Sequence, residues 1–461
     1  MRRTCAVLSF LFLAAINLQL SAQNKLFGNW EGILSAGQQK FRLIIHISQD
    51  SSGFKTTLDS PQQNAYKIPM ESTAVSGDTV IIKDKKSGIT ITGLYRSASD
   101  SIYSNFAQFG ARFSMKWGRT SATNEFNRPQ TPKAPFPYRS EEVTFTNPRA
   151  GNIKLAGTLT LPENVKNPPA VILISGSGPQ DRNEQIFMHE PFLVLSDYLS
   201  RNGIAVLRYD DRGIGKSEGI FNTATTQDFA TDAIAALEYL KSRNDIDTKK
   251  IGLIGHSEGG LIAPMIASKD KSVAFIVLLA APGVSIDKLM LRQARDIAEI
   301  RNAPQIEIDK IQETNGAVFD MIRNSPGNSP LDSAVVGILK KHNYAGGNEV
   351  ACRNFAQTIL SPWYRNFIRL NPDEYLEKVL CPVLAMNGDL DKQVNARMNL
   401  DAIRSALNKS GNKDVTIQTM NGMNHLFQEA KTGSDTEYVQ IEQTMSPLVL
   451  DMISKWLHDR F

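Results

Sequence analysis

IGLIGHSEGGLIAP, residues 251–264, is the most informative stretch of this 461-residue chain. It places Ser257 in the pattern G-x-S-x-G, after a short apolar run and before a second apolar run rich in helix-forming residues. The pattern by itself arises by chance in about one chain in ten of this length. A strand, a tight turn and a helix in this order are typical of a turn that presents a nucleophilic serine above a sheet. An ordinary turn between strand and helix is the alternative, and the partners of Ser257 must decide between them.

The region around this stretch alternates short, continuous apolar runs with helical patterns. Such runs predict strands that are buried on both faces, in a mostly parallel sheet with helices on both sides. The predicted strands are Ala170–Ile174, Ile204–Tyr209, Lys250–Ile254, Phe275–Leu279 and Val383–Asn387, with a lead-in hairpin at Glu142–Phe145 and Lys154–Leu161. We therefore expect an α/β core in two parts, residues 141–285 and 377–461. No strand pattern occurs between them, so residues 286–376 are predicted to form a helical insertion that acts as a lid.

The N-terminal part of the chain has a different character. Residues 1–22 combine a basic start, an apolar run and small residues at the end, which predicts a secretory signal and export to the periplasm or beyond. The apolar run is too short and too interrupted to predict a membrane span. Alternating patterns such as Phe41–Ile47 predict a β-barrel or sandwich over residues 23–125. The proline-rich residues 126–140 are predicted to be a stiff linker.

Composition narrows the function classes. The net charge is +4 and no basic block stands out, which argues against a nucleic-acid partner. Neither C-x-x-C nor H-E-x-x-H occurs, so we predict no metal and no cofactor. Cys352 and Cys381 are the cysteines left after the leader, and a disulfide between them is open, although the apolar surroundings of Cys381 favour a thiol. Nothing indicates an oligomeric state.

A serine nucleophile needs a base, and an acid that orients the base. Of the six histidines, His425 lies late in the chain, in a loop after the predicted strand Val415–Thr419, and is the best candidate for the base. The acid is expected at the end of the strand Val383–Asn387, where Asp389 and Asp391 compete. We prefer Asp391 because it lies farther past the strand end. Either aspartate could instead cap the next helix.

An oxyanion needs two backbone donors. The N–H of Glu258, directly after Ser257, is one candidate, and the N–H of Ser177 in the glycine-containing loop SGSGPQDRNE is the other. The stretch RYDDRGIGKSEG ends like a phosphate-binding loop, but Asp210 stands where the first glycine of that motif is required. We interpret this stretch as a charged turn that braces the catalytic face.

The motifs RYDDRGIGKSEG, GHSEGG, NGDLDKQV and NHLFQ, in this order, resemble those of bacterial α/β-hydrolase carboxylesterases with an N-terminal β domain, near the dienelactone-hydrolase-like and serine-aminopeptidase-like groups. The resemblance covers nearly the whole chain after the leader. It implies an α/β-hydrolase fold, a triad of Ser257, Asp391 and His425, and a loop through Ser177 that forms half of the oxyanion hole. One departure is that Ser175-Gly176 stands where many α/β-hydrolases have His-Gly.

The expected function is hydrolysis of a small-molecule ester through an acyl-enzyme. Trp363, Tyr364 and Phe367 of the insertion either line a pocket for an apolar acyl or aryl group or pack a helix onto the core. A serine aminopeptidase or amidase is the first alternative, with Glu184, Glu190 or Glu258 as the candidate site for a free amine. The second is a glycan- or lipid-binding β domain with an accessory hydrolase. Its face would use the aromatics Trp30, Tyr66, Tyr103, Phe106, Phe109 and Trp117.

Overall fold

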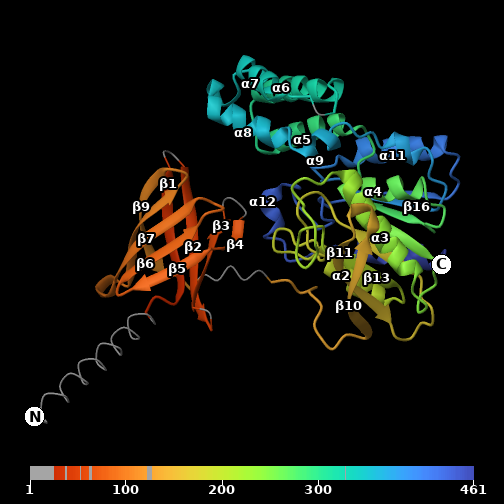
Figure 1. Cartoon of the computed structure of the whole chain (residues 1–461), viewed down its shortest axis with the longest axis horizontal. Helices are drawn as coiled ribbons and strands as arrows, with labels where there is room; N and C mark the ends of the chain where they lie inside the picture. The colour runs from red at the N-terminus through yellow and green to blue at the C-terminus, as the bar shows by residue number, and fades with distance from the viewer. Residues whose placement is uncertain (1–24, 37–38, 52, 62–64, 122–126, 328) are drawn as a thin grey trace, which may run out of the picture. The chain divides into compact units, whose positions relative to one another are not determined.

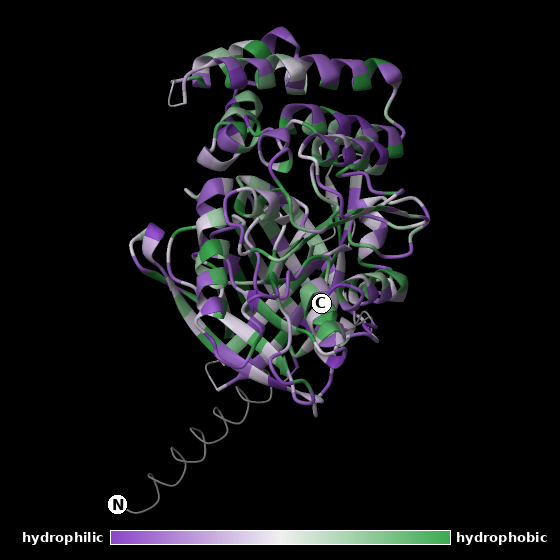
Figure 2. Cartoon of the chain, turned by 90° about the vertical axis from the view of Figure 1, so that its right-hand side faces the viewer, coloured by the Kyte–Doolittle hydropathy of each residue, from purple (hydrophilic) through white to green (hydrophobic). Residues whose placement is uncertain are grey.

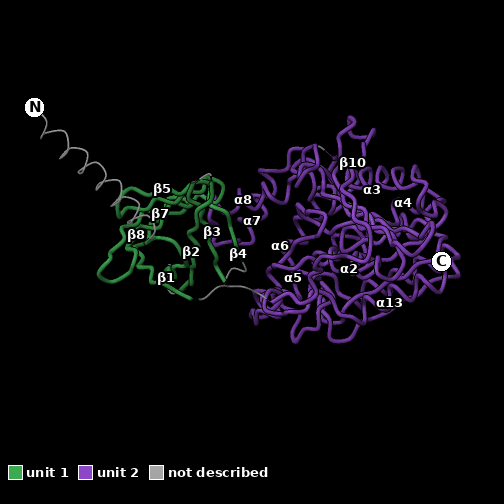
Figure 3. The backbone as a smooth tube through the Cα atoms, turned by 90° about the horizontal axis from the view of Figure 1, so that it is seen from below, with its two compact units in different colours: residues 1–126 green, residues 127–461 purple. Residues whose placement is uncertain are grey.

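The computed structural model of the chain describes residues 25–36, 39–51, 53–61, 65–121, 127–327 and 329–461. The predicted leader, residues 1–22, lies outside the described residues. The chain divides into two compact units, residues 1–126 and 127–461 (Figure 3). Among the described residues, none of the helices combines the length and the apolar character needed to cross a bilayer.

Unit 1 is an all-antiparallel sheet of strands in the order β4-β3-β2-β1-β9-β8-β7-β6-β5. The strands are β1 (Gly28–Ala36), β2 (Gln39–Asp50), β3 (Gly53–Ser60), β4 (Ala65–Pro69), β5 (Ser72–Ser76), β6 (Thr79–Asp84), β7 (Ile89–Arg96), β8 (Ser101–Gln108) and β9 (Ala111–Arg119). Alternate residues fill one shared core, which explains the period-two pattern of the sequence.

The aromatic residues of unit 1 do not form one exposed face. Trp30, Phe106 and Trp117 are buried, and the Trp117 indole N–H donates to the Ser104 hydroxyl at 2.8 Å. Tyr103 and Phe109 are exposed. Three of the six aromatics considered for a recognition surface are therefore core residues of the sheet.

Unit 2 contains a mixed sheet in the order β10-β11-β13-β12-β14-β15-β16-β17. Its strands are β10 (Tyr138–Asn147), β11 (Ile153–Pro162), β12 (Ala170–Ile174), β13 (Ala205–Tyr209), β14 (Ile251–His256), β15 (Ile276–Leu279), β16 (Val383–Gly388) and β17 (Val415–Met420). β10 and β11 form the antiparallel hairpin, β11 joins β13 antiparallel, and all later pairs are parallel. This is the sheet that the apolar runs predict.

Helices cover both faces of this sheet (Figure 1). α3 (Thr226–Lys241), α4 (Glu258–Ala267) and α11 (Ala396–Lys409) share one apolar core, and α2 (Pro191–Arg201) and α13 (Pro447–His458) share the other. In β12, Ile172 faces the first core and its neighbour Val171 the second. Because both faces of each strand are buried, successive residues are apolar and the strand reads as a continuous apolar run.

The predicted insertion between β15 and β16 is helical. It contains α5 (Ile286–Ile300), α6 (Gln305–Asn324), α7 (Asp332–Lys341), α8 (Glu349–Ile359), α9 (Pro362–Phe367) and α10 (Asp373–Leu376). These helices alternate hydrophilic and hydrophobic residues along their length (Figure 2). The apolar sides of α6, α7 and α8 pack against one another in a separate core that includes Val318, Val335, Leu339 and Cys352.

Part of the proline-rich stretch packs on unit 2. The Arg128 guanidinium donates to the main-chain oxygens of Met188, Val439 and Ile441 at 2.8 to 3.0 Å. β10 begins at Tyr138, inside the range 126–140 that the proline content assigns to a linker. Proline density predicts extended backbone, but an extended segment can lie along a domain surface as readily as it can span a gap.

Candidate active site

Ser257 occupies a sharp turn between β14 and α4. Its φ is 51° and its ψ is −116°, a conformation that is unfavourable for a residue with a side chain. The turn is held because the Ser257 N–H donates to Leu279 O and the Gly260 N–H donates to Ser257 O, both at 2.9 Å. Such strain at a serine between strand and helix is typical of functional sites.

Two glycines are required for this turn. A Cβ atom on Gly255 would lie 2.0 Å from the main-chain oxygen of Gly259, and a Cβ on Gly259 would lie 2.1 Å from the main-chain oxygen of Ile174. Real Cβ atoms do not approach backbone so closely. The glycines therefore allow α4 to start directly against the ends of β12 and β14.

His425 and Asp391 lie in direct contact. The Nδ1 atom of His425 is 2.7 Å from Oδ2 of Asp391, and both side chains are buried. The other carboxylate oxygen of Asp391 accepts the main-chain N–H groups of Gln393 and Val394 at 2.7 and 2.9 Å. Because Asp391 accepts at Nδ1, the Nε2 atom of His425 is left as the basic nitrogen.

Asp389, the competing carboxylate, has a different partner. It accepts the main-chain N–H of Gly422 at 2.7 Å and so ties the end of β16 to the loop that carries His425. A Cβ on Gly388 would lie 2.1 Å from the main-chain oxygen of Met423, which shows how closely strand and loop approach. Of the two aspartates, Asp391 is the one whose carboxylate contacts the imidazole within the described residues.

The loop from Ser175 to Glu184 lies against the serine turn. A Cβ on Gly176 would be 3.2 Å from the Cβ of Ser257. Asp211 fixes the loop from one side, since its carboxylate accepts the Ser175 hydroxyl at 3.0 Å and the Gln180 N–H at 2.9 Å. Asp211 is thus the partner of Ser175, the residue that stands where many α/β-hydrolases have histidine. Ser177 lies in the segment between Ser175 and Gln180, the two residues that Asp211 binds.

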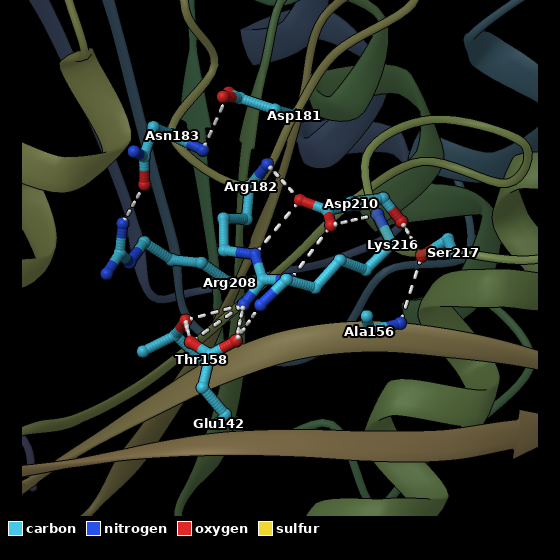
Figure 4. Close-up of polar contacts among 10 residues, drawn as sticks. All are labelled: Glu142, Ala156, Thr158, Asp181, Arg182, Asn183, Arg208, Asp210, Lys216 and Ser217. Atoms are coloured by element: carbon cyan, nitrogen blue, oxygen red, sulfur yellow. Dashed lines mark hydrogen bonds and ion pairs between the residues drawn. The ribbon is translucent and has the colours of Figure 1, made fainter. Parts of the chain in front are cut away.

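The charged turn after β13 anchors the same loop farther out (Figure 4). The carboxylate of Asp210 accepts the main-chain N–H groups of Arg182 and Lys216, both at 2.9 Å. The Arg182 guanidinium also binds Asp210 and reaches Glu142 on β10 and Thr158 on β11. The stretch RYDDRGIGKSEG therefore supplies consecutive carboxylates, Asp210 and Asp211, that hold the backbone of the glycine-containing loop.

Two buried carboxyl groups near the site are hard to ionise. Burial raises the pKa of Glu258 to about 7, against the opposing effect of hydrogen bonds from Thr226 and Trp363. Burial likewise raises the pKa of Asp211 to about 8, and the negative charge of Glu258 adds to the effect. Carboxyl groups whose pKa is raised by burial are common in active sites and also in buried structural networks.

A cavity of about 530 Å³ lies between the glycine-containing loop and the insertion. Ser177, Gly178, Phe221 and Asn222 line it from the α/β core, and Thr358, Ser361, Trp363 and Tyr364 line it from α8, α9 and the turn between them. Its size suits a small organic group. The predicted oxyanion residue Ser177 and two of the three predicted pocket aromatics thus line one cavity.

Phe367, the third aromatic, does not line this cavity. It is buried in the α/β core and its ring stacks on that of Trp363 with centroids 4.7 Å apart. The Trp363 indole N–H donates to the Glu258 carboxylate at 2.9 Å. Trp363 is therefore held between the core and the residue after Ser257, and Phe367 supports it from beneath.

Sequence reasoning assigned no positioning role to Glu184 or His256, and it gave the bracing role of RYDDRGIGKSEG to the whole stretch without singling out Asp211. His256 is the residue directly before Ser257, and Glu184 is considered above only as a candidate amine-binding group. Their contacts join segments far apart in the chain, which no local pattern encodes. The one available signal was the acidic residue Glu184 at the end of the loop SGSGPQDRNE.

Within the part of the chain that the structure describes, no cluster of histidine, cysteine and acidic residues could hold a metal ion. Cys352 and Cys381 are both free thiols. Cys352 is buried in the core of the insertion, and burial raises the pKa of the Cys381 thiol to about 11. The disulfide left open by the sequence is absent.

The fold and the site define an α/β-hydrolase-type protein. A family model described as serine aminopeptidase, S33, matches residues 191–430, more than half of the chain. The chain belongs to this family. The match contains the serine turn, the insertion, Asp391 and His425.

Individual relatives include esterases. The chain is 25% identical over 303 residues to esterase EstD of Thermotoga maritima, a match that covers 66% of this chain and 65% of EstD. It is 28% identical over 148 residues to the putative hydrolase YtaP of Bacillus subtilis, covering 28% of this chain and 50% of YtaP. The chain thus spans less than two thirds of the length of these relatives. Among solved structures, esterase Pf2001 of Pyrococcus furiosus aligns with 18% identity and a TM-score of 0.43, covering 72% of this chain and 98% of that one.

Proposed function

We propose that this protein hydrolyses carboxylic esters of small molecules through an acyl-enzyme on Ser257. The observation that carries the proposal is the contact of 2.7 Å between Asp391 and Nδ1 of His425, beside a serine in a strained turn between strand and helix. His256, the residue before that serine, packs its ring against the ring of His425 with centroids 4.7 Å apart. The family and the esterases among its relatives support the same reaction class.

In the proposed first half-reaction the Ser257 oxygen attacks the ester carbonyl carbon while Nε2 of His425 takes the hydroxyl proton. Asp391 holds the ring in the required tautomer and stabilises the imidazolium that forms. The N–H groups of Glu258 and Ser177 donate to the carbonyl oxygen as it gains negative charge. The tetrahedral intermediate then collapses, the alcohol leaves with the proton from His425, and the acyl group stays on Ser257.

In the second half-reaction water takes the place of the alcohol. His425 removes a proton from the water molecule, whose oxygen attacks the acyl carbon. Collapse of the second intermediate releases the carboxylic acid and returns the proton to Ser257. No redox step and no co-reactant other than water are needed.

The cavity beside Ser177 supports an apolar acyl or aryl group. Trp363, Tyr364 and Phe221 give it aromatic walls. Because burying such a group contributes roughly 25 cal/mol per Å² of apolar surface, a bulky acyl group gains affinity that an acetyl group does not.

A serine aminopeptidase is the second candidate, since the family model carries that description. A peptide with a free amine needs an accessible anion. Glu184 and Glu258 are each 2% exposed, and Glu190 already accepts a hydrogen bond from Asn183 at 2.8 Å. These contacts favour esters over aminoacyl peptides.

A panel of esters and aminoacyl amides tests the assignment, with wild type and Ser257→Ala measured side by side. We expect turnover of esters that rises with the size of an apolar acyl group, and a loss of several orders of magnitude in the variant. Faster turnover of amides that carry a free amine than of esters would instead support the second candidate function, a serine aminopeptidase.

We also propose that residues 1–22 direct export to the periplasm or beyond. The basic start and the apolar run of the sequence support this. Mass measurement of the protein from fractionated cells tests it, with a mature chain that begins at Gln23 outside the cytoplasm as the expected result. A full-length chain confined to the cytoplasm would contradict it.

A further inference from the structure

A second acid–histidine pair lies on the other side of the nucleophile. The Nδ1 atom of His256 is 2.9 Å from Oε1 of Glu184, and both side chains are buried. The same Oε1 atom accepts the main-chain N–H of Gly176 at 2.7 Å. The Nε2 atom of His256 lies 3.0 Å from the main-chain oxygen of His425. One pair thus contacts the glycine-containing loop, the nucleophile turn and the loop of the proposed base.

The partners define the protonation of His256. A main-chain oxygen only accepts hydrogen bonds, so Nε2 of His256 must carry a proton. Oε1 of Glu184 accepts from Gly176 as well, and an ionised carboxylate only accepts, so Nδ1 carries a proton too. His256 is then an imidazolium whose counter-ion is Glu184. Burial by itself would lower the pKa of His256, but the charge of Glu184 and the hydrogen bond to it raise that pKa above its usual value.

Two observations distinguish this pair from ordinary packing. Glu184 has a φ of 53°, an unfavourable conformation for glutamate, so the loop is strained at the point where it delivers the carboxylate. The second oxygen, Oε2, is buried with no hydrogen-bond partner among the described residues. A buried charge that lacks a full set of partners is costly, and such cost is characteristic of groups retained for function.

We propose that Glu184 and His256 are positioning residues. They hold the glycine-containing loop and the loop of His425 in place against the serine turn, with His256 as an imidazolium. This inference rests on the proposed ester hydrolysis. Because Gly176 is bound through its N–H, the next N–H, on Ser177, stays oriented toward the developing oxyanion. Because His256 binds the main chain of His425, the base keeps its place relative to Ser257. Among the described residues, His425 and Asp391 are the other charged or titratable groups that face His256.

Kinetics of Glu184 variants test the positioning role. Glu184→Gln keeps an acceptor for Gly176 and removes the charge, and we expect kcat to fall about tenfold. Glu184→Ala also removes the acceptor, and we expect a fall of about 100-fold, since misplacing an oxyanion donor by about 1 Å has an effect of this size. KM should change less than about threefold in both variants. The double variant with His256→Gln should lose no more than the larger single loss, because the residues act as one unit.

Asp59→Asn is the matched control. Asp59 is a buried carboxylate 2.8 Å from Nε2 of His46 in unit 1, so the substitution makes the same chemical change at a second acid–histidine pair. We expect unchanged kcat and KM. A kcat of Glu184→Ala within about twofold of wild type, or a loss that lies only in KM, would overturn the proposal.

The charge state of His256 is tested without any substrate. In protein labelled with ¹⁵N-histidine, the ring of His256, assigned by comparison with His256→Gln, should carry protons on both nitrogens at about pH 7.5, where a free imidazole is mostly neutral. That signal should disappear in Glu184→Gln and in His256→Gln. A neutral His256 ring in the wild-type protein would overturn the proposal even if a variant failed to fold. Absence of ester turnover together with the expected NMR signal would instead contradict the proposed function.

Discussion

Glu258 makes the stability of unit 2 depend on pH in a way that one substitution can remove. Its carboxyl group has a pKa raised by burial from 4.5 to about 7. Between these two pH values the folded protein holds a proton that the unfolded chain has released. Stability therefore falls as the pH rises through this window, and the whole loss is present above pH 7. At about 1.4 kcal/mol for each tenfold change in proton affinity, the loss is about 3 kcal/mol.

Glu258→Gln keeps the shape of the side chain and abolishes this titration. The amide oxygen, in the position of Oε1, can still accept from the Trp363 indole and from the Thr226 hydroxyl, which both donate to that oxygen in the wild type. Relative to wild type, the variant should gain about 3 kcal/mol of unfolding free energy between about pH 4.5 and pH 8. Removal of the Glu258 charge also lowers the pKa of Asp211, and this further raises the unfolding free energy of the variant relative to wild type at high pH.

Denaturant unfolding at about pH 5 and pH 8 measures this difference, with the unfolding free energies of the two proteins compared at each pH. Glu163→Gln, a substitution at an exposed glutamate, is the control and should give the same difference at both values. If the difference in unfolding free energy between wild type and Glu258→Gln is the same at both pH values, Glu258 is not a buried carboxyl group with a raised pKa.

Three other substitutions, two of them paired with a control variant, address the site and its turn. Asp391→Asn should lower kcat for esters about 10⁴-fold because it misorients the base, whereas Asp389→Asn should stay within about threefold of wild type, both measured by steady-state hydrolysis. Tyr364→Ala should lower kcat/KM about tenfold for a bulky aryl or long-chain ester and leave an acetyl ester unaffected, since it removes a wall of the cavity beside Ser177; equal losses on both esters would argue against that pocket. Gly259→Ala should destabilise the protein by about 3 kcal/mol or more, because its Cβ would meet the backbone of Ile174 at 2.1 Å. Gly316→Ala in α6, where nothing lies within 4 Å of the added atom, should stabilise by about 0.5 to 1 kcal/mol in the same denaturation assay.

The strands of the α/β core could be predicted because their environment is simple. A strand buried on both faces has an apolar residue at every position, so β12 was predicted with the bounds that the structure has and β16 to within one residue. The serine turn could be predicted for a related reason. Gly255 and Gly259 are sterically required, and such requirements leave a readable pattern.

What lay beyond prediction depends on the direction in which single side chains point. Trp363 and Phe367 are four residues apart on one short helix, and their spacing does not say that one ring lines a cavity and the other enters the core. The contact of Glu184 with His256 joins a loop to a turn more than 70 residues away. Such contacts depend on how loops meet above the sheet, which neither periodicity nor composition encodes.

Labelling with a fluorophosphonate, followed by mass mapping of the adduct, tests the central claim most directly, because the reagent reacts with an activated serine whatever the natural substrate. We predict one adduct, on Ser257, absent in Ser257→Ala and formed much more slowly in His425→Ala, whose serine lacks its base. Ester turnover without an adduct on Ser257, or labelling of another residue at the same rate in wild type and Ser257→Ala, would contradict the account.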